Sequence, residues 1–176
     1  MKSTFLSSSL LISLLAMSAN LRAETATSNL LITGNILSRT CEVENDTQTV
    51  NIGKFSASDF TAVGSVSAQK EFDIKLTGCD SSVSGVVIRF TGTADKDNSR
   101  LLALSDGDNM AKGIGIEIVD NKSLLLIPIN QEDVPAYSLT PGADNTLTFA
   151  LRYKSTQDVV VPGNAAAVMY FDLQYQ

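Results

Sequence analysis

Apolar and polar residues alternate with a period of two near both ends of the chain. In the N-terminal stretch 24–40, apolar residues or glycine occupy the even positions from Leu30 to Ile36, whereas Thr33 and Asn35 are polar. A second alternating run lies at 165–176. This period is typical of a β-strand with one buried face. We therefore expect an apolar strand near each end, and each needs something that covers it.

Short apolar or alternating runs lie between these two stretches, separated by turns that contain Gly, Pro, Asn and Asp. We expect strands at 49–52, 71–76, 86–90, 101–104, 113–119, 124–127 and 146–153. The one helical candidate is a single turn within 55–70, a stretch rich in Ser, Ala and Asp. Short strands separated by turns, without an amphipathic helix of useful length, predict an all-β sandwich.

Residues 1–23 have the pattern of a secretory signal peptide. Lys2 gives a positive start, residues 10–16 form an apolar core, and Ala23 is a small residue before the expected cut. Cleavage after Ala19 is the alternative. The apolar core is too short for a permanent membrane anchor, so we expect an exported chain.

Composition narrows the classes of function. The chain has 176 residues, of which 44% are hydrophobic and 18% charged, which suits one domain with a buried core. Without Lys2 and Arg22, which leave with the signal peptide, 11 basic residues oppose 19 acidic ones. This balance disfavours nucleic acid and anionic membranes as partners. The chain contains no histidine and no spacing typical of catalysis, so we expect neither an enzyme nor a metal or cofactor site.

The chain holds two cysteines, Cys41 and Cys79. An even number of cysteines in an exported protein predicts a disulfide. Closing this loop would stabilise the fold by about 4 kcal/mol in the loop-entropy model. The alternatives are a metal site, for which further ligands are missing, and a free reactive thiol.

Four short motifs are spread over the mature chain. They are Gly34 seven residues before Cys41, LysLeuThrGlyCysAsp at 75–80, GlyIleGlyIleGluIleValAsp at 113–120, and PheAlaLeuArgTyr at 149–153 followed by ProGlyAsnAlaAla at 162–166 and the penultimate Tyr175. In combination they resemble the pilin subunits of chaperone–usher fimbriae, in particular the type 1 fimbrial group. The resemblance covers essentially the whole mature chain.

The resemblance implies an incomplete immunoglobulin-like sandwich that lacks its last strand. An apolar groove would then stay open beside the C-terminal strand. A periplasmic chaperone would fill the groove with one of its own strands. At the outer-membrane usher, the N-terminal extension of the next subunit would replace that strand, which is β-augmentation between molecules. The chain would thus be a structural subunit of an adhesive fimbria, exported through the periplasm to the cell surface.

The same resemblance assigns roles to particular residues. It divides the mature chain into a donor-strand extension at 24–40 and a pilin domain at 41–176. The donor residues would be Leu30, Ile32, Gly34 and Ile36. The acceptor groove and chaperone contact would comprise Ala167, Met169, Phe171, Leu173, Tyr175 and the terminal carboxylate of Gln176. Burial of three Leu or Ile side chains would contribute about 5 to 9 kcal/mol before ordering costs.

Two alternatives remain open at this stage. Gly34 would mark a bulge if the first strand paired within its own chain instead of with a neighbour. A single-domain adhesin that binds a host glycan or protein through surface loops is the alternative function. Two-domain tip adhesins of the family carry a separate lectin domain, for which we expect no room before the extension. The sequence does not separate a position in the fibre shaft from one at its tip.

Overall fold

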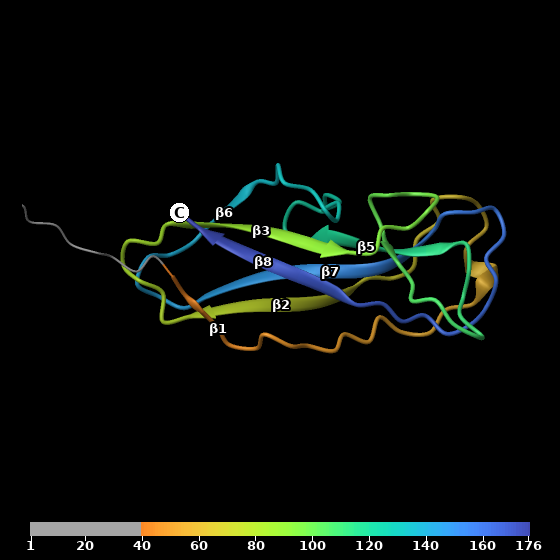
Figure 1. Cartoon of the computed structure of the whole chain (residues 1–176), viewed down its shortest axis with the longest axis horizontal. Helices are drawn as coiled ribbons and strands as arrows, with labels where there is room; N and C mark the ends of the chain where they lie inside the picture. Colours follow the sequence, from red (N-terminus) through yellow and green to blue (C-terminus); the bar gives the residue numbers. More distant parts are fainter. Residues whose placement is uncertain (1–39) are drawn as a thin grey trace, which may run out of the picture. The chain divides into compact units, whose positions relative to one another are not determined.

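Two antiparallel β-sheets enclose the core in the computed structural model, which describes residues 40–176 (Figure 1). The five-stranded sheet has the order β1 (Glu42–Val43), β2 (Lys70–Thr77), β7 (Asn145–Ser155), β5 (Ile114–Asp120) and β4 (Leu102–Ala103). The three-stranded sheet has the order β6 (Ala136–Ser138), β3 (Gly85–Gly92) and β8 (Met169–Tyr175). One 3-10 turn, Ala57–Asp59, lies within the predicted helical stretch. The predicted all-β sandwich is confirmed.

The core forms because alternate side chains of β2, β3 and β7 point between the sheets. Phe149 of β7 is fully buried and contacts the rings of Phe72, Phe90 and Tyr137, which come from β2, β3 and β6. These contacts place β6 opposite β7, and β3 opposite β7 and β2. The free end of the three-stranded sheet, β8, therefore lies on the β1–β2 side of the sandwich.

The strand β5 is buried on both faces, unlike a typical half-exposed antiparallel strand. Its core face carries Ile114, Ile116 and Ile118. On the outer face, Leu101 packs so closely on Gly115 that a Cβ there would lie 3.1 Å from its side chain. Glu117, also on the outer face, is buried as well. A layer of connecting chain thus covers this part of the five-stranded sheet.

Glu117 is kept charged by two basic neighbours on β7. Arg152 Nε and Lys154 Nζ both donate to its carboxylate, the lysine at 2.6 Å. Burial alone would raise the pKa of Glu117, but the hydrogen bonds from Lys154 and Arg152 outweigh it and hold the pKa below its ordinary value. The buried carboxylate therefore ties β5 to β7 as an ion.

Two of the predicted strands are wrong. Residues 124–127 follow a turn in which the Asp120 carboxylate accepts from the backbone N–H groups of Lys122 and Ser123. Leu124 has φ 59°, and Leu124 and Leu125 are 65% and 68% exposed. Beyond this turn, Leu126 forms a single bridge with Val119 of β5, so the apolar run pairs at one residue rather than along a strand.

Residues 49–52 have no hydrogen-bonded strand partner among the described residues. Val50 and Ile52 are half-buried and pack against the core. Their alternation therefore reflects side-chain burial rather than a sheet ladder. Within residues 40–176, the structure contains no helix that is long and apolar enough to cross a membrane.

Candidate functional site: the free edge of β8

Among the strands of the described residues, β8 has a partner on only one side. Its seven residues pair with β3 from Val86↔Tyr175 to Gly92↔Met169, and no other strand of residues 40–176 pairs with its opposite edge. Figure 1 shows β8 as the outer strand of its sheet. An unpaired strand edge is a template on which another extended chain can add.

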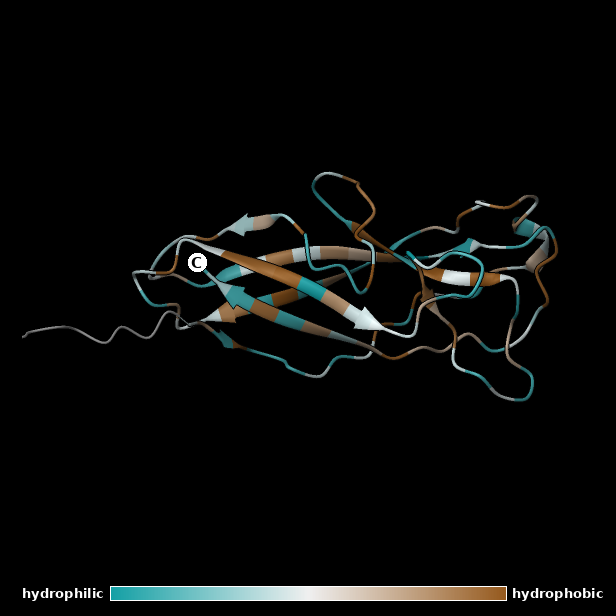
Figure 2. Ribbon diagram, turned by 45° about the horizontal axis from the view of Figure 1, so that its top comes forward, coloured by the Kyte–Doolittle hydropathy of each residue, from teal (hydrophilic) through white to brown (hydrophobic). Residues whose placement is uncertain are grey.

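The side chains of β8 alternate in burial as their sequence alternates in polarity. Met169, Phe171, Leu173 and Tyr175 are half-buried and pack against the core, and Ala167 just before the strand does the same. Tyr170, Asp172 and Gln174 are exposed, and the alternation is visible along the ribbon in Figure 2. The structure thus brings the predicted groove residues together on one face.

The inward side chains of the neighbouring strand β3 are buried more deeply than those of β8. The inward side chains of β3, Val86, Ile88 and Phe90, are 0–1% exposed. The strand β3 lies between β6 and β8, whereas β8 has nothing on its outer side among the described residues. Apolar surface of β8 is therefore left in water, where one further strand would cover it.

A second apolar wall lies on the same side of the sandwich. Beside it, the segment that follows β1 forms with the start of β2 an open, mostly polar depression of about 510 Å³, lined by Gln48, Thr49, Val50, Asn51, Gly53, Lys70, Glu71 and Phe72. Val50, Ile52 and Phe72 are half-buried and pack against the core. In the sequence, the alternation at 49–52 marks these side chains, but it predicts a strand rather than a wall of the groove.

The C-terminal end of β8 is hydrogen-bonded to Cys41, the first residue of the predicted pilin domain. The Tyr175 hydroxyl donates to the carbonyl oxygen of Cys41 at 3.1 Å, and burial raises the pKa of this hydroxyl. Gln176 is held by two backbone bonds, from its own N–H to Gly85 O and from Ser84 N–H to an oxygen of its terminal carboxylate. The end of β8 and the start of the described chain therefore lie at the same pole of the sandwich.

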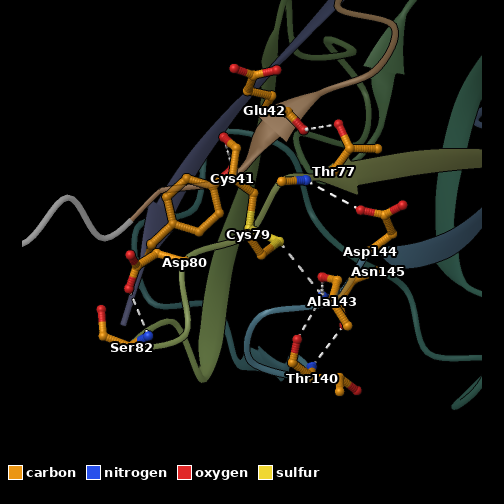
Figure 3. The surroundings of a disulfide bond; sticks show 12 residues. Cys41, Glu42, Thr77, Cys79, Asp80, Ser82, Thr140, Ala143, Asp144 and Asn145 are labelled. Carbon is orange, nitrogen blue, oxygen red and sulfur yellow. Dashed lines mark hydrogen bonds between the residues drawn. A yellow bond between two sulfur atoms is a disulfide. The ribbon is translucent and has the colours of Figure 1, made fainter.

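The predicted disulfide lies at this pole (Figure 3). It joins Cys41, just before β1, to Cys79, just after β2, so the disulfide is confirmed and the two cysteines are not free thiols. Asn145, at the start of β7, donates to Cys79 Sγ at 3.6 Å and to Ala143 O at 2.8 Å. The crosslink thus fixes the position from which the chain before Cys41 departs.

The predicted donor residues Leu30, Ile32, Gly34 and Ile36 lie outside the described residues, as does the predicted signal peptide at 1–23. The structure therefore describes the acceptor side of the predicted exchange.

Comparisons with known proteins agree with this arrangement of strands. The sequence model of the family described as "Fimbrial protein" matches residues 30–176. The chain belongs to this fimbrial family. Among its relatives, the fimbrial-like protein YcbU of Escherichia coli K12 is 41% identical over 152 residues, which cover 82% of each chain. The type 1 fimbrial subunit of Salmonella typhimurium is 38% identical over 148 residues, covering 81% of this chain and 80% of the relative.

Solved structures share the fold of this fimbrial subunit. The antigen and type I fimbria protein BPSL1626 of Burkholderia pseudomallei superposes with a TM-score of 0.61 at 33% identity, covering 77% of this chain and 89% of that one. The P pilus rod subunit PapA superposes with a TM-score of 0.63 at 24% identity, covering 77% and 99%. The chain is a structural pilin with an immunoglobulin-like sandwich, and fimbriae are appendages of the cell surface.

Proposed function

We propose that this subunit polymerises by donor-strand exchange, in which residues 24–40 of one copy lie along the free edge of β8 of the next. The half-buried inward face of β8, beside the fully buried face of β3, carries the proposal. Leu30, Ile32 and Ile36 would cover that face, with Gly34 among them. Their burial, about 5 to 9 kcal/mol in total, adds to edge hydrogen bonds of about 1 kcal/mol each.

The position of Cys41 sets the direction in which the extension enters. Because Tyr175 contacts Cys41, the extension departs at the pole where β8 ends. If it entered a neighbour at that same pole, two such poles would meet and close a dimer. Entry at the Met169 end keeps the contact head-to-tail, which generates an open filament. The extension would then run antiparallel to β8.

A chaperone and an usher complete the proposal. An exposed apolar strand edge is an aggregation hazard until it is covered, so a periplasmic chaperone would supply a temporary strand before the neighbour does. Its basic residues would hold the terminal carboxylate of Gln176, an exposed residue at the end of β8. The outer-membrane usher would then bring the next extension to the groove. The subunit would act structurally, without catalysis.

Deletion of residues 24–40 tests the proposal. The mature chain and the deletion variant are expressed in the periplasm with and without the cognate chaperone. Without the chaperone, we expect both to aggregate or be degraded. With it, we expect the deletion variant to bind the chaperone and to accept an extension, but not to insert into another subunit.

Two results would contradict the proposal. A full-length chain that stays monomeric and stable alone, with the β8 edge protected from amide exchange by its own extension, would refute exchange between subunits. A deletion variant that still inserts into another subunit would refute the donor role of residues 24–40.

A further inference from the structure

Exposed apolar side chains gather at the pole opposite the disulfide, where β7 ends and β8 begins. We call them the apolar collar: Phe55, Val63, Val66, Val159, Val161 and Val168. Contacts of this part of the chain place it there. The Phe55 ring lies 5.9 Å from the Tyr153 ring, and Val66 forms a backbone bridge with Lys154, both near the end of β7.

The connection from β7 to β8 forms the main part of the collar. No charged residue occurs from Val159 to Phe171, yet Val159 is 71% and Val161 45% exposed. The connection is held in place, because Val161 and Lys112 exchange backbone hydrogen bonds of 3.0 and 3.1 Å. A Cβ on Gly163 would lie only 2.5 Å from backbone atoms of Met110 and Ala111. The valines are therefore presented to water by a fixed segment, as at an interaction surface.

We propose that the apolar collar docks against the disulfide pole of the donor copy, the one whose extension lies along the collar's own β8. This inference rests on the proposed function, because antiparallel entry brings the donor copy to the Met169 end of β8. Cys41 follows Ile36 by five residues, so the fully extended chain between them spans at most about 18 Å. A donor body on so short a tether lies against the collar.

The opposite pole offers a suitable surface. Around the disulfide, the loop before β7 exposes Pro141 and Gly142, with the half-buried Ala143 beside them. These three residues are small or apolar and uncharged, whereas the exposed Asp144 follows them in the loop and the exposed Glu42 follows Cys41. A second copy thus provides, at its disulfide pole, a small uncharged surface bordered by carboxylates, on which valine side chains can be buried. The joint would then consist of the exchanged strand and a contact between the two bodies.

Chemical labelling of single cysteines tests the contact. Val159→Cys places a thiol in the collar, and Leu125→Cys places a matched thiol on the turn after β5, where Leu125 is 68% exposed. Both variants are made in the full-length chain, with the native disulfide verified by mass spectrometry under non-reducing conditions. Maleimide labelling rates are then measured for chaperone-bound monomers and for assembled polymers.

We expect polymerisation to slow labelling at Val159→Cys by roughly tenfold or more, as for the dry core of an interface, and to change labelling at Leu125→Cys less than about twofold. Polymers in which both thiols react as fast as in monomers would overturn the docking of the collar while leaving strand exchange intact. Failure of the unaltered chain to polymerise would overturn both proposals.

Substitution by aspartate gives a second measurement. Val159→Asp combined with Val161→Asp is expected to leave binding of a synthetic peptide of residues 24–40 unchanged. The same variant is expected to shorten the bending persistence length of polymers in electron micrographs by roughly threefold, since only one of the two contacts remains. The Leu125→Asp polymer is the control. Equal stiffness of all three polymers would contradict the inference.

Discussion

The strands β5 and β8 are both seven residues long, yet they differ in burial and in the pairing of their edges. Every residue of β5 is buried, and strands of the same chain pair with both of its edges. No residue of β8 is fully buried, and within residues 40–176 one edge has no strand partner. One sandwich can therefore contain a buried strand that is paired along both edges and a half-buried strand that leaves one edge open to a further strand.

The largest expected effect is the loss of peptide binding when a charge is placed on the inward face of β8. Phe171→Asp points a carboxylate at the surface that the donor strand covers, whereas Tyr170→Asp alters the exposed face next to it. We expect Phe171→Asp to weaken binding of the peptide 24–40 by roughly 1000-fold, because an unpaired charge would be buried. Tyr170→Asp should change binding little. Fluorescence anisotropy of a labelled peptide measures both, and equal affinities would contradict the groove.

Truncation of one side chain on each strand sharpens the comparison. Ile118→Ala in β5 should lower the free energy of unfolding by about 3 kcal/mol, since a fully buried side chain leaves a cavity. Leu173→Ala in β8 should cost about 1 kcal/mol in the chain alone and more once the peptide 24–40 is bound. Denaturant unfolding with and without the peptide measures the difference. A loss for Leu173→Ala that does not depend on the peptide would refute an open groove.

The ion pair on β5 predicts a pH dependence that β8 should not share. Because the folded-state pKa of Glu117 is lowered, its contribution is fully present above the unfolded pKa of about 4.3 and is lost as the pH falls through the folded pKa. Glu117→Gln should cost about 2 kcal/mol at pH 7 and progressively less below about pH 4. Glu44→Gln, which breaks the exposed pair with Lys75, should cost less than about 0.5 kcal/mol. Urea unfolding across this pH range provides the check.

The smallest expected effect concerns the hydroxyl that fastens β8 to its own chain. Tyr175→Phe removes the hydrogen bond to the Cys41 carbonyl and should lower the free energy of unfolding by about 1 kcal/mol. Tyr170→Phe, on the exposed face, is the matched control and should have no measurable effect. Thermal unfolding of the chaperone-free, peptide-bound subunits compares them. Identical stabilities would show that the bond contributes nothing in solution.

The sequence predicts which faces of these strands are buried better than it predicts which edges are paired. Period-two alternation located β2, β7 and β8 because a side chain's face depends only on its position along the strand. The same alternation at Val50 and Ile52 marked buried side chains without a sheet partner, since pairing depends on distant segments. The burial of Glu117 carried no signal in the sequence, because Arg152 and Lys154 meet it only through the pairing of β5 with β7. The open edge of β8 followed from family resemblance rather than from its pattern.

The disulfide has a mechanical consequence in a fibre assembled as proposed. Tension would enter each subunit at Cys41 and leave through β8, which is hydrogen-bonded to β3. The covalent link carries that load directly from Cys41 to Cys79, just ahead of β3. The intervening loop with β1 and β2 is thereby bypassed, so pulling on the fibre cannot peel these strands away one hydrogen bond at a time. The strands in the force path are instead loaded in shear along their whole length.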